Sequence, residues 1–312
     1  MRSARWVARQ NDAHQNRSRM HRLQIRFLPI LITGVLLVVG LAGCGASGSG
    51  GPALAASVNG HGITLGDYQG MLGFYKASAA QQSNVDWRTA AGRTQLANAR
   101  TSTFDFLINL ELMREQLSQR HLSVAQKDIA SARKQLDSQI TAAQSQNSAS
   151  LKAVIASLTP RVRDLFVEQQ VDSLTLAAHI SVPTVHARGI LVQSQADAQK
   201  LLAQAQAGAD FGKLAQQNSK DTTTASTGGE LGTVYLGQFG SEFDSKVFGV
   251  NKPPKYVITQ AGTGYALFEI TQPAEKPLSS VTDATTQQSI LDEWLRMDVR
   301  GHANVQRYVA TG

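Results

Sequence analysis

Apolar residues between positions 55 and 182 recur mostly at helical spacing. From about Thr89 to Gln119 they fall close to every 3.6 residues, which predicts one long helix with an apolar stripe. Further periodic stretches follow, and Pro160 separates two of them because proline cannot continue a helix. Ahead of the long helix, Val58 to Thr64 reads as two short strands joined by an Asn-Gly turn. We therefore expect residues 55–182 to form a mostly helical domain.

The pattern changes at Pro183. Residues 185–192 read as a strand. Two short helices, a loop rich in serine, threonine and glycine, and further strands follow up to residue 272. Such a mixture within about 90 residues predicts a compact α+β domain over 183–272.

The last part of the chain, residues 273–312, is predicted to hold a linker and one helix. Prolines mark the linker, and the helix runs from about Asp283 to Val305 with one apolar face. Because such a face needs a partner, we expect this helix to pack on the helical domain. The fold class of the whole chain is therefore α+β.

The only strongly apolar run of the chain extends from Phe27 to Ala42, behind a basic stretch and ahead of small residues. It is shorter than the roughly 20 residues that a membrane-spanning helix needs. The order basic, apolar, small is typical of an export signal, which would occupy residues 1–43. Met20 also begins a more compact version of this leader, so translation from Met20 in place of Met1 is a hypothesis.

Cys44 is the only cysteine of the chain and directly follows this apolar run and Gly43. The sequence Leu-Ala-Gly-Cys resembles the lipobox of bacterial lipoproteins. The resemblance implies that Cys44 is lipidated and becomes the first residue of the mature chain, with residues 44–54 as a flexible tether. The alternative is an uncleaved membrane anchor with an incidental cysteine.

The basic character of the chain belongs to its leader. The whole chain has 30 Lys and Arg against 23 Asp and Glu, but residues 1–43 hold seven of the arginines and one of the aspartates. The remainder is close to neutral, so charge gives no support for a nucleic-acid partner. With Cys44 acylated, no thiol is left for disulfides or thiolate chemistry. The histidines show no metal-ligand spacing, and we expect no metal and no cofactor.

Several short motifs follow one another between residues 190 and 265: Ile190-Leu191-Val192, Gly208-x-Asp210-Phe211-x-x-Leu214-Ala215, Ser219-x-Asp221, Gly228-Gly229-Glu230-Leu231-Gly232, Gly237-Gln238-Phe239 and Gly264-Tyr265. In this order they resemble a parvulin-type (PpiC, rotamase) peptidyl-prolyl isomerase domain. The segment from Val58 to Tyr68, the long helices and the final helix look like the chaperone part of SurA/PrsA-type extracytoplasmic foldases. That resemblance implies that the isomerase domain is inserted between N-terminal helices and a C-terminal helix that packs on them.

The resemblance to parvulins implies a proline-binding pocket at Leu231, Phe239 and Phe243, with a hydroxyl contributed by Thr263. The alternative is that the three apolar residues are simply core. Asp221 and Thr222 match polar positions near the family's catalytic site. Asp221 either acts there through its charge or only caps its own loop.

Both members of the family's histidine pair are replaced in this chain, by Gly189 and Ala266. His186 lies three positions earlier on the same predicted strand, so its side chain should point to the opposite face and cannot take over. Because both members of the pair are absent, no buried histidine is left without its hydrogen-bond partner, and the fold can tolerate the change. We therefore expect the domain to fold and its isomerase activity to be weak or absent.

Rotation about an X–Pro bond must overcome about 18–20 kcal/mol, but it breaks no covalent bond. An isomerase therefore needs only a pocket and polar groups that favour the twisted amide. The sequence predicts a lipid-anchored foldase, outside the cytoplasm or in the periplasm, that binds unfolded or newly exported polypeptides and X-Pro segments. The alternatives are an isomerase that works without the histidine pair, a non-catalytic holdase or scaffold whose parvulin domain only binds peptide, and a ligand-binding surface lipoprotein.

Overall fold

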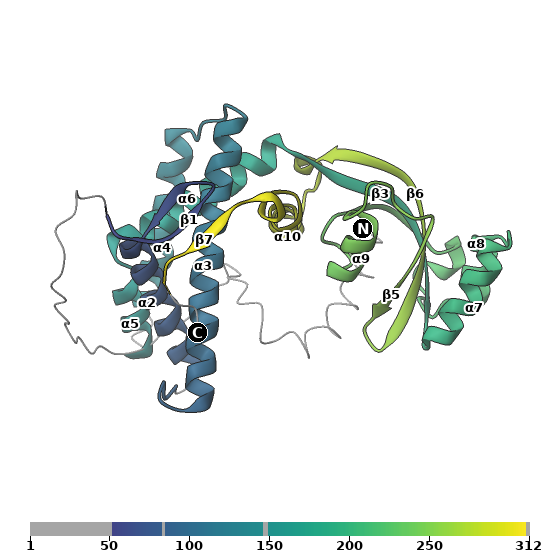
Figure 1. The fold of residues 1–312 in the computed structure, drawn as a ribbon, viewed down its shortest axis with the longest axis horizontal. Coiled ribbons are helices and arrows are strands. Elements are labelled where there is room, and N and C mark those ends of the chain that lie inside the picture. The colour runs from purple at the N-terminus through teal and green to yellow at the C-terminus, as the bar shows by residue number, and fades with distance from the viewer. Residues whose placement is uncertain (1–51, 83–84, 146–148, 310–312) are drawn as a thin grey trace. The chain divides into compact units, whose positions relative to one another are not determined.

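A computed structural model describes residues 52–82, 85–145 and 149–309 of the chain (Figure 1). The export signal, Cys44 and most of the tether lie outside these residues. Within the described ranges, no helix is both long and apolar enough to cross a membrane. The described residues divide into two compact units.

The helical unit consists of the described residues up to Leu176 together with those from Val299 onward. Its elements are β1 (Leu54–Val58), β2 (His61–Thr64), α2 (Leu65–Gln82), α3 (Ala90–Gln119), α4 (Gln126–Gln144), α5 (Ala149–Ser157), α6 (Pro160–His179) and β7 (Val305–Arg307). The long helix α3 begins as predicted, because the Thr89 side chain accepts a hydrogen bond from the Gly92 N–H. Its buried stripe packs against α2, where Tyr68 lies 4.7 Å from Phe104 between ring centroids.

The C-terminal strand closes the sheet of the helical unit. β1 pairs with β2 on one side and with β7 on the other, both antiparallel. Side chains reinforce this pairing: the Tyr308 and Ser57 hydroxyls lie 2.9 Å apart, and the Arg307 guanidinium lies 5.0 Å from the Phe104 ring centroid. The first and last strands of the described residues, β1 and β7, are therefore joined directly.

The α+β unit spans residues 177–298. Its elements are β3 (Ser181–Val192), α7 (Gln195–Gln206), α8 (Phe211–Asn218), β4 (Glu230–Tyr235), α9 (Ser241–Val247), β5 (Tyr256–Ala261), β6 (Gly264–Pro277) and α10 (Ala284–Trp294). The strands form an antiparallel sheet in the order β4-β3-β6-β5. Ser194 caps α7 by accepting a hydrogen bond from the Asp197 N–H, and Gly208, which follows α7, has φ +96°.

The two faces of this sheet carry different clusters, as strand alternation requires. One cluster, which we call the α7 face, joins Ile190, Val192 and Leu267 to residues of α7 and α8. The other cluster, the α9 face, joins Ala187, Ala266 and other strand residues to the α9 residues Phe243 and Val247.

The C-terminal helix differs from the prediction. The sequence placed a helix over about 283–305 and packed it on the helical domain. In the structure α10 ends at Trp294, a π-helical turn covers Leu295–Val299, and α10 groups with the α+β unit. Against α10 lies Gly237, where an added Cβ would come within 3.1 Å of the Glu293 Cβ. The apolar face of α10 showed that it needs a partner, but it did not specify which one.

Candidate functional site

The α9 face holds Gly189 and Ala266, the two positions at which we predicted that the family's histidine pair is replaced. In the register of β3 and β6, Gly189 pairs with Phe268 and Leu191 pairs with Ala266. Directly paired residues share a face, and so do residues two apart on one strand. Gly189 and Ala266 are therefore diagonal neighbours on one face of the sheet.

Neighbouring side chains fill the space above Gly189. A Cβ built on Gly189 would lie 3.1 Å from the Leu231 Cδ1 and 3.7 Å from ring atoms of Phe268. Leu231 is 7% exposed, and Ala266 and Phe268 are fully buried. A side chain larger than glycine at this position must therefore displace Leu231.

Aromatic rings make up much of this face. Phe243 and Phe268 are fully buried with their ring centroids 4.9 Å apart, and Phe239 lies 5.3 Å from Phe243 and 5.2 Å from Phe268. Phe239 is only partly buried. The structure thus brings together the three residues predicted for the proline pocket. Leu231 and Phe243 are packed as core residues, and Phe239 reaches the surface.

The predicted polar residues are less closely assembled. Asp221 is buried, and its carboxylate accepts hydrogen bonds from the Thr223 N–H at 3.1 Å and the Thr224 hydroxyl at 2.5 Å. These are the contacts of a loop-capping residue. Thr222 is exposed beside it, and Thr263 is exposed in the turn between β5 and β6. The catalytic role of Asp221 and Thr222 stays a prediction.

Sequence reasoning missed a hydroxyl that lies on the α9 face. Thr259 of β5 pairs with Ala266 and is 4% exposed, so its side chain is buried on the same face as Ala266. It also missed Phe268, which lies two residues beyond Ala266. Because alternate residues of a strand lie on the same face of a sheet, applying this alternation to the two predicted strands would have found both residues.

His186 lies on the other side of the sheet from Gly189, as predicted. Its Nε2 atom is 2.9 Å from the Glu230 Oε1 atom, and the Arg188 Nε atom is 3.5 Å from Glu230 Oε2. These side chains are all more than a third exposed. His186 therefore belongs to a surface charge cluster.

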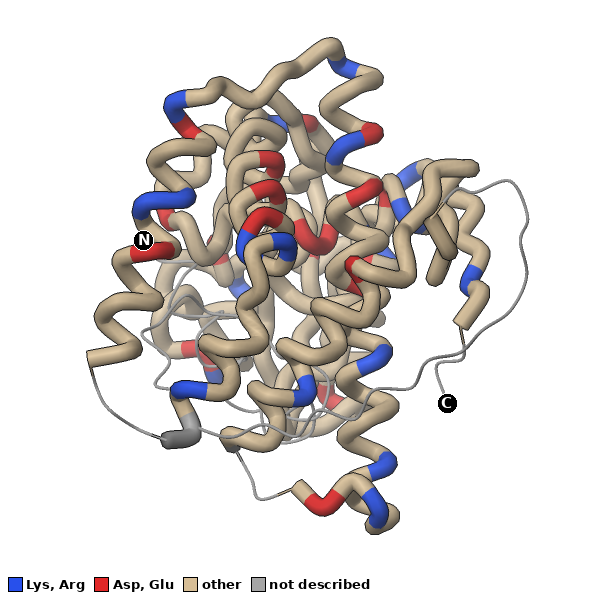
Figure 2. Tube along the Cα trace, turned by 90° about the vertical axis from the view of Figure 1, so that its left-hand side faces the viewer, with Lys and Arg blue, Asp and Glu red and all other residues tan. Residues whose placement is uncertain are grey.

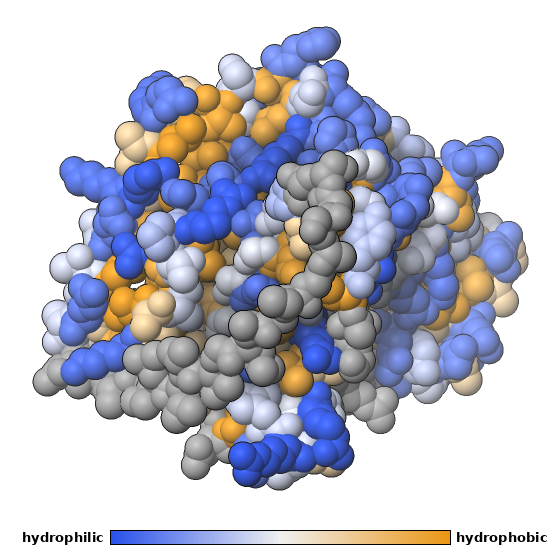
Figure 3. Space-filling model, turned by 60° about the vertical axis from the view of Figure 1, so that its left-hand side comes forward, coloured by the Kyte–Doolittle hydropathy of each residue, from blue (hydrophilic) through white to orange (hydrophobic). Residues whose placement is uncertain are grey.

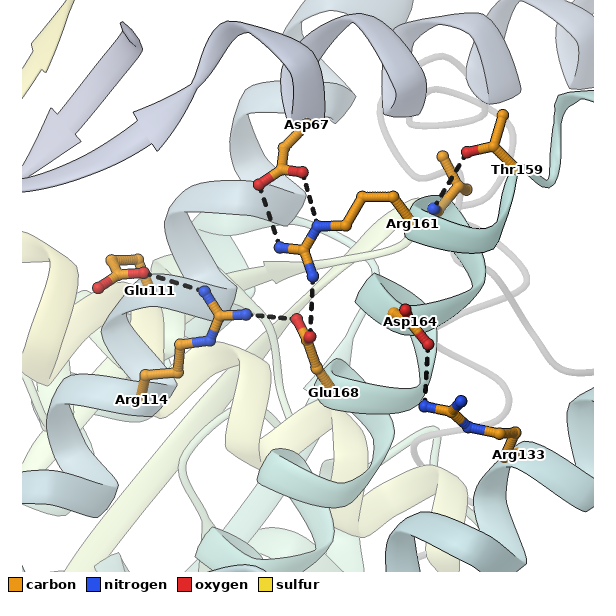
Figure 4. Close-up of polar contacts among 9 residues, drawn as sticks. Asp67, Glu111, Arg114, Arg133, Thr159, Arg161, Asp164 and Glu168 are labelled. Carbon is orange, nitrogen blue, oxygen red and sulfur yellow. Dashed lines mark hydrogen bonds and ion pairs between the residues drawn. The ribbon is translucent and has the colours of Figure 1, made fainter. Parts of the chain in front are cut away.

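A second polar cluster holds together three elements of the helical unit (Figure 4). Arg161 of α6 binds both carboxylate oxygens of Asp67, on α2, at 2.8 and 3.1 Å, and binds Glu168 at 2.9 Å. Arg114 of α3 joins Glu168 to Glu111. Figure 2 shows such acidic and basic residues side by side on the helices that face the viewer.

Burial alone would raise the pKa of Asp67, but the hydrogen bonds and charge of Arg161 outweigh it, so its pKa is lowered. Asp172, one turn after Glu168 on α6, behaves in the opposite way. Burial raises its pKa to about 6, Arg114 opposes the rise, and Glu168 adds to it. This cluster consists of arginines and carboxylates, and no group of metal-ligating residues is present in the described part of the chain.

Two family models together match most of the chain. The model described as a SurA-like N-terminal domain matches residues 17–171, and the model described as a PPIC-type PPIase domain matches residues 166–274. The chain belongs to the SurA/PrsA-type parvulin foldases. The foldase therefore carries a peptidyl-prolyl isomerase domain of the PPIC type, which contains the α9 face described above.

Solved structures similar to this foldase are distant relatives. PrsA from Bacillus anthracis has 19% identity over 61% of this chain and 94% of its own, with a TM-score of 0.29. PrsA from Streptococcus pneumoniae has 19% identity over 62% and 76%, with a TM-score of 0.31. A structure reported with the SurA-like chaperones of Campylobacter jejuni has 17% identity over 80% and 93%, with a TM-score of 0.28. No curated protein matches the chain, so the family assignment rests on the two family models.

Proposed function

We propose that this foldase works outside the cytoplasm, is held at the membrane by a lipid on Cys44, and binds unfolded, newly exported polypeptides. The observation that carries the proposal is the presence of both matched domains in one chain, the SurA-like domain over 17–171 and the PPIC-type domain over 166–274. Export and lipidation are supported by the leader and the Leu-Ala-Gly-Cys sequence that ends at Cys44.

Half-exposed aromatic rings on the helical unit support client binding there. Phe74 of α2 and Phe106 of α3 both pack on Phe166 of α6, with ring centroids 4.9 and 5.4 Å away, and both are only half-buried. Leu174, also on α6, is 56% exposed. Figure 3 shows apolar patches interrupted by polar side chains on the face turned to the viewer. Patches of this kind suit apolar segments of many sequences.

The α9 face supports weak isomerase activity. Catalysis of rotation requires groups that bind the twisted amide better than the planar one. Around Gly189, the three atoms nearest to an added Cβ belong to the apolar side chains of Leu231 and Phe268. The buried Thr259 hydroxyl lies on the same face and is the group we propose for any residual activity.

Two assays on the same preparation test this function. We expect the foldase to slow aggregation of an unfolded client, and to accelerate isomerisation of a proline tetrapeptide far less than an intact parvulin does in a protease-coupled assay. Turnover equal to that of an intact parvulin would overturn the weak-isomerase proposal. Protection with no turnover at all would favour the holdase alternative, which the filling of the Gly189 site by Leu231 already supports.

Matched variants locate the client surface. Phe74→Ser with Phe106→Ser should reduce protection against aggregation, because it removes the half-exposed rings. Val250→Ser is the control, since Val250 is a 45% exposed apolar residue of the other unit. Equal protection by all three proteins would exclude the helical unit as the client surface.

Labelled palmitate should enter the wild-type protein in bacteria and should not enter Cys44→Ala.

A further inference from the structure

The outer edge of β5 is closed by two side chains in place of a strand. β5 is the last strand of the sheet order β4-β3-β6-β5, and Figure 1 shows it at the rim of the sheet. The Ile258 C=O accepts a hydrogen bond from the Lys246 Nζ at 2.9 Å, and the Gln260 N–H donates to the Glu242 Oε2 at 3.0 Å. Lys246 and Glu242 also bind each other at 2.8 Å.

These contacts fix the direction of the backbone groups on this edge. In an antiparallel strand, the N–H and C=O of one residue point to the same side, and successive residues alternate. Since the Ile258 C=O and the Gln260 N–H point away from β6, the Ile258 N–H and the Gln260 C=O point away as well. The edge therefore presents two donors and two acceptors spaced as a neighbouring strand would need them.

A groove of about 330 Å³ runs along the same edge. Its lining includes Gln199 and Leu202 of α7, Glu242 and Lys246 of α9, and Ile258 of β5. α7 and α9 contribute to clusters on opposite faces of the sheet, so a groove that touches both must cross the edge of β5.

From this geometry we propose that the β5 edge binds an extended segment of a client polypeptide as an additional antiparallel or parallel strand. Strand pairing of this kind depends on hydrogen bonds to the client's backbone. It is therefore compatible with clients of many sequences, including segments without proline. The inference rests on the proposed client-binding function and adds a second surface, separate from the aromatic rings of the helical unit.

The energetics favour displacement of the Glu242–Lys246 pair. Both side chains are about half exposed, at 49% and 48%, and exposed ion pairs of this kind contribute little to stability. An incoming strand replaces their two backbone contacts and adds hydrogen bonds to the Ile258 N–H and the Gln260 C=O. In this exchange the edge gains two backbone hydrogen bonds and loses only an exposed ion pair, which suits reversible binding.

The polar lining argues for a client segment over a second copy of the foldase. Stable dimers bury about 1,200–2,000 Å² with an apolar centre. This edge presents glutamines and a charged pair, which can form hydrogen bonds with the N–H and C=O groups of a peptide backbone. A different interpretation is that Glu242 and Lys246 only protect the edge strand against unwanted pairing, as charged side chains do in many sheets.

The test measures binding of a fluorescent, proline-free octapeptide rich in valine and threonine to the full-length foldase. Gln260→Pro removes the outward-pointing N–H and puts the proline ring in its place, so it should weaken binding at least about tenfold, the equivalent of one to two hydrogen bonds. Gln260→Ala keeps the N–H and is the matched control, expected to bind like wild type. Glu242→Ala with Lys246→Ala uncaps the edge and should tighten binding up to about fivefold.

Hydrogen exchange keeps the test informative if Gln260→Pro does not fold. In the wild-type foldase the peptide should slow exchange of the Ile258 and Gln260 amides. Unchanged exchange there, or equal binding by folded Gln260→Pro and Gln260→Ala, would overturn the proposal. A dimer that becomes monomeric in Gln260→Pro would overturn it in favour of a second copy. Aggregation suppression that persists while the β5 edge binds nothing would leave the proposed function intact and remove only this inference.

Discussion

Asp244 should make the stability of the α+β unit fall as the pH rises. Its side chain is fully buried on α9, and its Oδ1 accepts a hydrogen bond from the Gly237 N–H at 3.1 Å. Burial raises the pKa of Asp244 to about 8, the Gly237 hydrogen bond opposes the rise, and the neighbouring Glu293 carboxylate on α10 adds to it. At neutral pH the folded protein therefore keeps Asp244 protonated.

The magnitude follows from the difference between folded and unfolded states. The unfolded chain releases this proton near pH 3.8, whereas the folded chain holds it until about pH 8. Folding stability is therefore undiminished below pH 3.8, is lost progressively as the pH rises to about 8, and is constant above that. Each pKa unit corresponds to about 1.4 kcal/mol, so the loss across this window is at most on the order of 6 kcal/mol.

Asp244→Asn isolates this contribution, because the amide has a similar shape and never ionises. Urea unfolding at a series of pH values should show the variant gaining on the wild type from pH 4 to pH 8. Asp172→Asn in the helical unit is the control: the pKa of Asp172 is about 6, so its gain should end near pH 6. Parallel curves for the wild type and Asp244→Asn across pH 4–8 would refute the assignment of a protonated buried carboxyl.

The remaining predictions concern side-chain contacts within each of the two units. Phe243→Ala should cost about 3–5 kcal/mol of unfolding free energy because Phe243 is fully buried, whereas the partly exposed Phe239→Ala should cost less; equal losses in urea unfolding would contradict this. Gly189→His should destabilise through its 3.1 Å contact with Leu231. Adding Leu231→Ala should recover part of that loss, and strict additivity in a double-mutant cycle would contradict it. Arg161→Ala should lower the midpoint of thermal unfolding and raise the pKa of Asp67, which NMR titration measures directly; an unchanged pKa would show that Arg161 does not control it.

Local signals were sufficient to predict most helices, because caps and periodicity act over a few residues. The long helix begins at about Thr89 as predicted, with Thr89 as its cap, and Ser194 caps α7. By contrast, α4 begins at Gln126 after Ala125, which makes no side-chain cap. The end of α10 and the strand β7 were not predicted, because β7 is defined by pairing with β1, some 250 residues earlier in the chain.

The candidate site was predictable only in part, again because local sequence patterns act over a few residues. Alternation along β3 placed His186 correctly on the face opposite Gly189, whereas the position of Ala266 on the Gly189 face follows from the register of β3 with β6. The complete burial of the Phe243 side chain was not predictable, because it depends on how α9 packs over the sheet. The two oxygens of Asp221 likewise find their partners within their own loop, a geometry that sequence spacing permits but does not require.

The pairing of β1 with β7 has a consequence for the order of folding during synthesis. The α+β unit is continuous over residues 177–298, so it has all of its residues as soon as that stretch has emerged. The helical unit lacks its third sheet strand until Val305–Arg307 arrives. Contacts this far apart in sequence form slowly, because the loop between them must close first. A chain that stalls or is clipped between Asp298 and Val305 therefore leaves β1 without β7, although the α+β unit already has all of its residues.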